Sequence, residues 1–125
     1  MKRLIKNILL FFVAVLLLMT VGLFGIFYGL YHSIKNYTKV QFIKYWADVM
    51  YLINIGIGQI GNVILSPFLN RFFLIDNEGH KFGSVKETIS YALAINYFTN
   101  NLTKFGLVIV FILDLFDKDH MEKSL

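Results

Sequence analysis

Hydrophobic residues are concentrated in long uncharged runs, of which the first covers residues 7–34. A helix over its apolar centre, residues 8–30, would be roughly 35 Å long at about 1.5 Å per residue, which is enough to cross a hydrocarbon core of ~30 Å. Secretory signals also begin with a basic head and an apolar run, but that run is only about 7–15 residues long and ends at an A-x-A-like site. We therefore expect an uncleaved membrane anchor.

The next uncharged stretch, residues 49–70, is interrupted by the amide side chains of Asn54, Gln59 and Asn62. It predicts a second, less apolar helix. Pro67 should kink or end this helix, because proline lacks a backbone N–H and clashes with the preceding turn. An amide that faces lipid costs free energy, so in a membrane the three amides should face another helix or water.

Between the two runs, residues 32–47 are polar with interleaved aromatic side chains. This pattern is typical of the membrane–water interface, where amphipathic rings settle. We expect a short juxtamembrane connection there. The aromatic residues concerned are Tyr31, Tyr37, Tyr45 and Trp46.

The C-terminal part begins with a predicted loop at residues 76–84, which are rich in Asn, Gly and charge. Ser84, followed by Glu87, matches a capping box and predicts a helix that begins at Ser84. The polar tract at residues 99–101 should break this helix. The apolar run that follows, residues 105–113, is too short to cross a membrane alone.

An alternative topology joins residues 89–116 into a third span, provided that Lys104 is tolerated in lipid. The tail, residues 114–125, has mixed charge and is expected in water. Asp114 should mark the place where the preceding apolar run leaves the membrane, because a carboxylate in lipid is expensive.

The pattern as a whole predicts an all-α integral membrane protein with two transmembrane helices, at about residues 8–30 and 49–69, and a C-terminal amphipathic helical region. One or three spans remain open. The chain divides into an N-terminal membrane anchor with its juxtamembrane segment, a second hydrophobic helix, and a loop with C-terminal helices and a polar tail. These parts cover residues 1–47, 48–75 and 76–125.

Composition supports lipid as the solvent. Hydrophobic residues make up 57% and charged residues 16% of the chain, against about 45–50% and about 25% in soluble domains. The absence of Cys excludes disulfides, cysteine-ligated zinc and a thiol nucleophile. The net charge of +4 comes from scattered basic residues without a patch that could follow phosphates, so we expect anionic lipid and no nucleic acid as partner.

The distribution of Lys and Arg favours both termini in the cytoplasm of a bacterial host, with the protein in the inner membrane. Six basic residues flank the proposed inner side and three the outer side. The inner ones are Lys2, Arg3, Lys6, Arg71, Lys81 and Lys86, and the outer ones are Lys35, Lys39 and Lys44.

Two glycine patterns favour helix packing. Residues 56–61, GIGQIG, fit G-x-G-x-x-G, but a dinucleotide-binding fingerprint needs a βαβ unit, and membrane-like runs flank this one on both sides. Gly22, Gly25, Gly29 and Ser33 fall at spacings of three and four on one face of the first helix. Such a small-residue face predicts self-association or packing onto the second helix.

Few groups could carry acid–base or metal chemistry. His80, Glu87, Asp117, Asp119 and His120 are the candidates, but none has a diagnostic spacing, and the sequence contains no H-E-x-x-H, G-x-S-x-G or P-loop motif. We therefore expect no enzyme, no cofactor and no metal site. A membrane-anchored enzyme or metal-binding module that uses His80, Glu87, Asp119 and His120 is the alternative.

Three tracts carry a resemblance to other proteins: GQIGNVIL with Gln59 and Asn62, KETIS with Glu87, Thr88 and Ser90, and LFDKDHMEKSL with Asp119 and His120. Their order and spacing, over roughly half of the chain, resemble small phage and prophage proteins of uncharacterised function that carry Gln-x-x-Asn, Glu-Thr-Leu/Ile-Ser and Asp-His-Cys tracts. Here Met121 stands in place of the Cys, Tyr91-Ala92 replaces a Ser-Arg pair, and an N-terminal anchor is added. The resemblance implies a phage or prophage origin rather than an activity.

These observations predict a small phage-type membrane protein that acts by membrane or protein interaction. Its partners would be the lipid bilayer and a second copy of the chain or another membrane protein. The sharpest form of this expectation is a holin-like role in host lysis. In that role an oligomer permeabilises the bilayer, and the polar residues of the second helix line the lesion.

Overall fold

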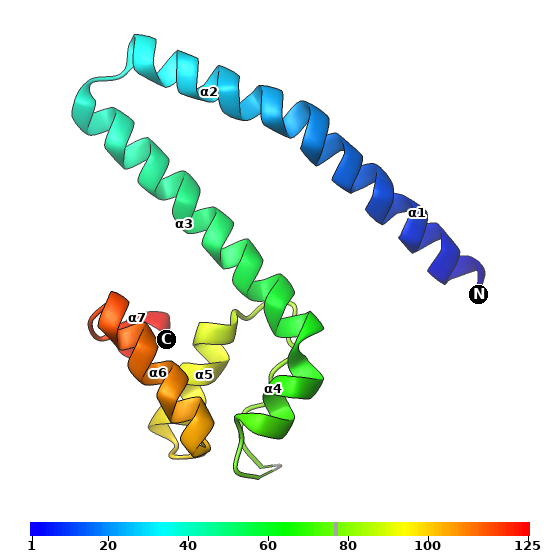
Figure 1. The fold of residues 1–125 in the computed structure, drawn as a ribbon, viewed down its shortest axis with the longest axis vertical. Coiled ribbons are helices and arrows are strands. Elements are labelled where there is room, and N and C mark those ends of the chain that lie inside the picture. The colour runs from blue at the N-terminus through cyan, green and yellow to red at the C-terminus, as the bar shows by residue number, and fades with distance from the viewer. Residues whose placement is uncertain (77) are drawn as a thin grey trace. The chain divides into compact units, whose positions relative to one another are not determined.

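The computed structural model describes residues 1–76 and 78–125 and is largely helical (Figure 1). In chain order the elements are α1 (Lys2–Leu17), the π-helical turn η1 (Leu18–Gly22), α2 (Leu23–Asn36), α3 (Lys39–Ile64), α4 (Ser66–Phe72), α5 (Ile89–Phe98), α6 (Lys104–Phe116) and α7 (His120–Ser124). The described residues form no strand, only an isolated bridge between Leu74 and Leu102, so the predicted all-α class is confirmed. The chain divides into a first unit, residues 1–48, and a second unit, residues 49–125.

α1, η1 and α2 join into one continuous rod, Lys2–Asn36, drawn in blue to cyan in Figure 1. The rod has 35 residues, and its most apolar stretch has a mean hydropathy of 2.8 with no residue buried. α3, with 26 residues and a mean hydropathy of 1.2, is the second helix that is long and apolar enough to cross a membrane. Both predicted hydrophobic helices are therefore present, and the first is much the more apolar.

The rod contains a wide turn at η1 that the hydrophobic pattern does not predict. Thr20 lies in this turn, and its hydroxyl donates a hydrogen bond of 2.8 Å to the carbonyl oxygen of Leu16. A Thr that bonds back to a helix carbonyl competes with the regular backbone bond and bends helices. This competition accounts for a local change from α to π geometry. Leu17 and Leu23, on either side of the turn, keep helical dihedral angles, so the rod continues through it.

Only Tyr37 and Thr38 separate α2 from α3, so the connection is much shorter than the expected residues 32–47. α3 begins at Lys39 because Thr38 and Gln41 form a capping box. The side-chain oxygen of Gln41 accepts from the backbone N–H of Thr38 at 3.0 Å, and the backbone N–H of Gln41 donates to the hydroxyl of Thr38 at 3.4 Å.

Aromatic side chains gather beside this turn in the first unit. The rings of Tyr37 and Tyr45 lie 5.6 Å apart, and those of Tyr45 and Trp46 lie 5.5 Å apart. The indole N–H of Trp46 donates to the hydroxyl oxygen of Ser33 at 3.1 Å. This bond joins the start of α3 to the end of α2.

Pro67 lies in the first turn of α4, and the helical run is broken at Leu65, between the end of α3 and the start of α4. Proline is tolerated in a first turn because the N–H groups there have no intrahelical partner. The predicted effect of Pro67 on the second helix is thus confirmed.

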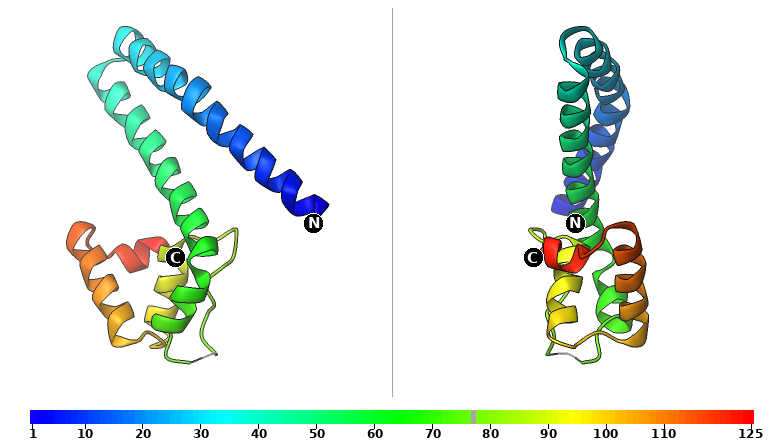
Figure 2. Two further views of the ribbon diagram at one scale, coloured as in Figure 1. Left: turned by 45° about the vertical axis from the view of Figure 1, so that its right-hand side comes forward. Right: turned by 90° about the vertical axis from the view of Figure 1, so that its left-hand side faces the viewer.

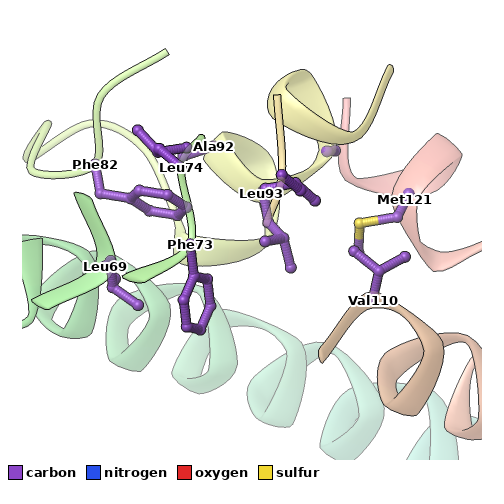
Figure 3. Close-up of a cluster of buried hydrophobic side chains, with 10 residues drawn as sticks. Leu69, Phe73, Leu74, Phe82, Ala92, Leu93, Val110 and Met121 are labelled. Atoms are coloured by element: carbon purple, nitrogen blue, oxygen red, sulfur yellow. The ribbon is translucent and has the colours of Figure 1, made fainter. Parts of the chain in front are cut away.

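The second unit has a hydrophobic core, to which α4, α5, α6, α7 and the loop before α5 contribute (Figures 2 and 3). Its buried members are Leu69, Phe73, Leu74, Phe82, Ala92, Leu93, Ala94, Leu102, Val110 and Met121. In Figure 3, Met121 of α7 lies against Val110 of α6. Met121 is only 2% exposed. The expectation of a tail that lies wholly in water is therefore wrong, because α7 closes one end of this core.

The helix expected from Ser84 begins later, at Ile89. Thr88 is its N-cap, with a hydroxyl that accepts from the backbone N–H three residues on at 3.1 Å. The carboxylate of Glu87 does not reach back to Ser84 but lies 2.8 Å from Nε2 of His80. The predicted capping box is therefore wrong, because Thr88 supplies the cap and Glu87 has a partner elsewhere in the fold.

The break expected at residues 99–101 is confirmed, since α5 ends at Phe98 and Asn100 has a φ of 56°. α6 then begins at Lys104 and has 13 residues. Two separate helices therefore occupy residues 89–116, and the alternative of one continuous span over this stretch is wrong.

Candidate functional site

Asn62 of α3 is fully buried and holds the segment that precedes α5. Its amide nitrogen donates to the carbonyl oxygens of Ser84 and Glu87 at 3.1 and 3.0 Å, and its amide oxygen accepts from the backbone N–H of Gly83 at 3.1 Å. Buried amides are paired in this way because an unpaired one costs free energy. Asn62 therefore faces a loop of its own chain.

Two further Asn side chains hold the same loop. Asn70 accepts from the backbone N–H of Phe82 at 2.9 Å and donates to its carbonyl oxygen at 3.0 Å. In the same way, the side-chain oxygen of Asn96 accepts from the backbone N–H of His80 at 3.0 Å, and its amide nitrogen donates to the carbonyl oxygen of His80 at 2.7 Å. With Asn62, these amides fix residues 79–88 without regular secondary structure.

The glycines of the GIGQIG tract let α3 approach the start of α5 closely. A Cβ at Gly58 would lie 3.1 Å from Cβ of Thr88, and one at Gly61 would lie 3.1 Å from Cδ1 of Ile89. A Cβ at Gly56 would meet no atom within 4 Å. Two of these three glycines therefore serve close packing within the chain.

A groove of about 860 Å³ opens beside this contact, and we call it the α3–α7 groove. Its walls are a stripe of α3 at helical spacing, the segment around the start of α5, and α7 with the residues before it. The lining residues are Tyr51, Asn54, Ile55, Gly58 and Gln59 from α3, Lys86, Glu87, Thr88, Ser90 and Tyr91 from the second wall, and Asp117, His120, Lys123 and Ser124 from the third.

Four polar side chains in the α3–α7 groove form a chain of hydrogen bonds. The hydroxyl oxygen of Ser90 lies 3.1 Å from Nε2 of His120, and Nδ1 of the same ring lies 3.0 Å from Oδ2 of Asp117. The other carboxylate oxygen of Asp117 accepts from the ammonium group of Lys123. The bond from Lys123, followed by that from His120, lowers the pKa of Asp117 below its usual 3.8. Asp117 therefore stays ionised at neutral pH.

The helix ends position these groups. α5 begins at Ile89, so Ser90 lies in its first turn. Asp119 adopts a left-handed conformation with a φ of 60°, which turns the chain into α7. The backbone N–H of His120 then donates to Oδ1 of Asp114 at 3.0 Å. With Met121 buried beside it, the imidazole of His120 is held over the first turn of α5.

The α3–α7 groove brings together residues that the sequence analysis takes from separate tracts. Its lining includes Asn54, Gln59, Glu87, Thr88, Ser90 and His120. Asn62 is buried next to it, and Asp119 is not part of the lining. In the part of the chain that the structure describes, no three His, Asp or Glu side chains gather as metal ligands.

The small-residue face of the rod has mixed surroundings in the first unit. Ser33 is buried beside the indole of Trp46. A Cβ at Gly29 would lie 4.0 Å from the hydroxyl of Tyr45, whereas one at Gly25 would meet nothing within 4 Å. At Gly22 the nearest atom belongs to a side chain of the same rod. The start of α3 therefore covers only the last part of this face.

Lys123 and Tyr51 were not expected from the sequence as lining residues, and Asp117 was named among the possible acid–base groups but assigned to a hydrated tail. The spacing of three between Asp117 and His120 was a visible signal, but it is common in mixed-charge tails. The link to Ser90, 30 residues away, arises only on folding.

The arrangement can move a proton. A neutral imidazole whose Nδ1 proton is bound by a carboxylate presents Nε2 as a base to a neighbouring hydroxyl. Comparison of the chain with protein families, with curated proteins and with solved structures found no match.

Proposed function

We propose that the chain is an integral membrane protein, anchored by the rod Lys2–Asn36, whose second unit works at the membrane surface. The exposure of the rod carries this proposal. It has 35 residues and no buried residue in its most apolar stretch, where a spanning helix needs roughly 20 residues. Soluble proteins rarely expose apolar patches of this extent. Lipid removes the hydrophobic penalty of such a surface.

α3 has two opposite sides. One side lines the α3–α7 groove, where Lys86, Asp117 and Lys123 face residues 51–59. The other side is exposed and apolar, with Ile53, Ile57, Ile60 and Ile64. A second crossing by α3 would carry the charged groups into hydrocarbon, which is expensive. A single crossing by the rod, with α3 lying at the interface, satisfies both sides.

Other helices of the second unit also expose apolar faces. Leu107, Phe111 and Leu115 of α6 are exposed, as are Phe68 and Phe72 of α4. Amphipathic helices lie in the interface with their apolar face buried about 5–10 Å into the boundary of headgroups and acyl chains. This supports contact between the second unit and the membrane surface.

This proposal departs from the holin-like role expected from the sequence. A lesion lined by α3 needs Asn54, Gln59 and Asn62 to face water, but Asn62 is satisfied inside the chain and Gln59 donates to the carbonyl oxygen of Lys86 at 3.4 Å. Both termini in the cytoplasm would need an even number of crossings, whereas a single crossing separates them.

Extraction of membranes tests the anchor. The full-length protein should stay in the membrane fraction after high-salt and carbonate washes, because hydrocarbon burial does not depend on ionic strength. A variant with Leu16→Arg and Leu23→Arg should move to the supernatant, since Arg near the centre of a span costs roughly 2.5–3.5 kcal/mol. Release of the unaltered protein by carbonate would overturn the proposal.

A further inference from the structure

The hydrogen-bond chain in the α3–α7 groove has the geometry of a hydroxyl nucleophile with its general base. Nε2 of His120 lies 3.1 Å from the hydroxyl oxygen of Ser90, and Nδ1 lies 3.0 Å from Asp117. Such distances allow a base to activate a nucleophile while a carboxylate orients the base. We propose that Ser90, His120 and Asp117 form an acyl-transfer centre that hydrolyses a carboxylic ester. This activity goes beyond the proposed membrane role.

Each residue has a separate task. With its proton on Nδ1, His120 donates to Asp117 and turns the Nε2 lone pair toward Ser90. Lys123 binds the other oxygen of Asp117 and keeps it ionised, so that it can stabilise the imidazolium that forms during the reaction. The imidazole is 25% exposed and Ser90 lines the groove, so a substrate can reach both.

The reaction needs only the ester and water. Oγ of Ser90 attacks the ester carbonyl carbon and gives its proton to Nε2 of His120. The bond to the alcohol then breaks, and the alcohol leaves with that proton. A water molecule attacks the acyl-serine next and gives a proton to Nε2. The bond to Oγ breaks, Oγ takes the proton back, and the carboxylic acid leaves.

Donors for the developing negative charge are at hand. The backbone N–H of Ser90, in the first turn of α5, has no partner within the helix. The amide nitrogen of Gln59 donates one N–H to the carbonyl oxygen of Lys86 and has a second N–H, and this side chain also lines the groove. Backbone and amide N–H groups stabilise oxyanions in acyl transfer.

The lining of the groove indicates the substrate class. Its volume of about 860 Å³ falls in the range of about 300–1,000 Å³ that is typical of small-molecule sites. Tyr51 and Ile55 offer apolar surface for an acyl chain. The charges around it have both signs, from Lys86 and Lys123 and from Glu87 and Asp117, which favours a neutral ester. Such an ester could be a soluble molecule or part of a membrane lipid.

Covalent labelling tests the nucleophile. The full-length protein in nanodiscs, treated with a fluorophosphonate, should carry one adduct on Ser90 by mass spectrometry. Ser90→Ala and His120→Gln should each lower labelling at least about 100-fold, the scale of general base catalysis. Ser66→Ala is the control, because Ser66 lies outside the lining of the groove and donates to the carbonyl oxygen of Val63 at 3.0 Å. Its labelling should equal that of the unaltered protein.

A second variant separates catalysis from a purely structural role in holding α7 on α5. In this Cys-free chain, Ser90→Cys should react with iodoacetamide at lower pH than Ser124→Cys, because a neighbouring imidazole favours the thiolate. Adding His120→Gln should remove the difference. Circular dichroism of each variant verifies that the helices remain.

Ester turnover completes the test. Ser90-dependent hydrolysis of p-nitrophenyl butyrate alone would identify a soluble ester as the substrate, and hydrolysis of phosphatidylcholine vesicles would identify a lipid. Absence of a Ser90 adduct together with equal pH profiles for the two Cys variants would overturn the proposal. Membrane extraction is unaffected by either result, so a failure here leaves the anchor standing.

Discussion

Individual amide side chains determine where the loop before α5 lies. Asn62, Asn70 and Asn96 each bind backbone donors and acceptors that no helix or strand satisfies. Every buried backbone polar group needs such a partner, and burial makes an unpaired one expensive. These three amides therefore take the place of regular secondary structure at residues 79–88.

Replacing Asn62 by Ala should lower the free energy of unfolding by about 2–4 kcal/mol, because buried backbone groups of the loop lose their partner. Denaturant unfolding followed by circular dichroism would measure this loss. Asn54→Ala is the control on the same helix, since Asn54 is exposed and surface substitutions change stability by only about 0.5 kcal/mol. Equal losses for the two variants would contradict the role given to Asn62.

The sequence indicated some of the polar residues in and beside the α3–α7 groove, but not the groove itself. It singled out Gln59 and Asn62 as polar positions in an apolar helix, but it could not show that their partners lie in the loop before α5, 21 to 27 residues away. Asp117 was assigned to a hydrated tail because local charge gives no sign of tertiary packing. The apolar neighbour that draws α7 inward, Met121, stands alone among polar residues.

The N-cap of α5 was predicted four residues too early, because two residues, Ser84 and Thr88, compete for that position. Ser84 and Thr88 both offer a hydroxyl before an apolar run, and local sequence favoured Ser84. Asn62 binds the carbonyl oxygens of Ser84 and Glu87, which takes them out of any helical ladder, and the packing of Gly58 against Thr88 fixes the start of α5. The all-α class was predictable because it follows from long apolar runs.

Substitution of Gly58 should weaken the contact between α3 and α5, whereas substitution of Gly56 should not. Gly58→Leu should lower the free energy of unfolding by about 1–3 kcal/mol, because the new side chain meets Thr88 in a packed region. Hydrogen exchange should show faster exchange at residues 84–91. Gly56→Leu, which enters open space on the same helix, is the matched control. Similar exchange in both variants would show that α3 does not hold α5 in this way.

For the whole molecule, the division of apolar surface between the two units is the main feature. The rod has almost no buried side chain, whereas the second unit combines a core with exposed apolar faces on α3, α4 and α6. This difference supports the proposal that the rod crosses a bilayer and that the second unit works at its surface.

The proposed single crossing makes a testable prediction about which residues lie on the same side of the membrane. Cysteines introduced at Asn36 and Glu78 of this Cys-free chain should lie on the same side of the membrane, opposite to one at Lys6. All three positions are exposed, so an impermeant thiol reagent applied to sealed vesicles should label either the first two or the third. If the reagent placed Asn36→Cys and Glu78→Cys on opposite sides, α3 would be a second crossing.

The hydrogen bond between Trp46 and Ser33 has an optical consequence. Trp46 is the only tryptophan of the chain, so emission excited at wavelengths that tyrosine does not absorb reports the surroundings of one indole beside the turn between α2 and α3. The second unit contains no tryptophan and is silent in this signal, while its helices contribute to circular dichroism. Transitions seen by two probes coincide only when a molecule unfolds in one step. Fluorescence and circular dichroism together can therefore measure the unfolding transition of the turn separately from that of the C-terminal helices, without any added label.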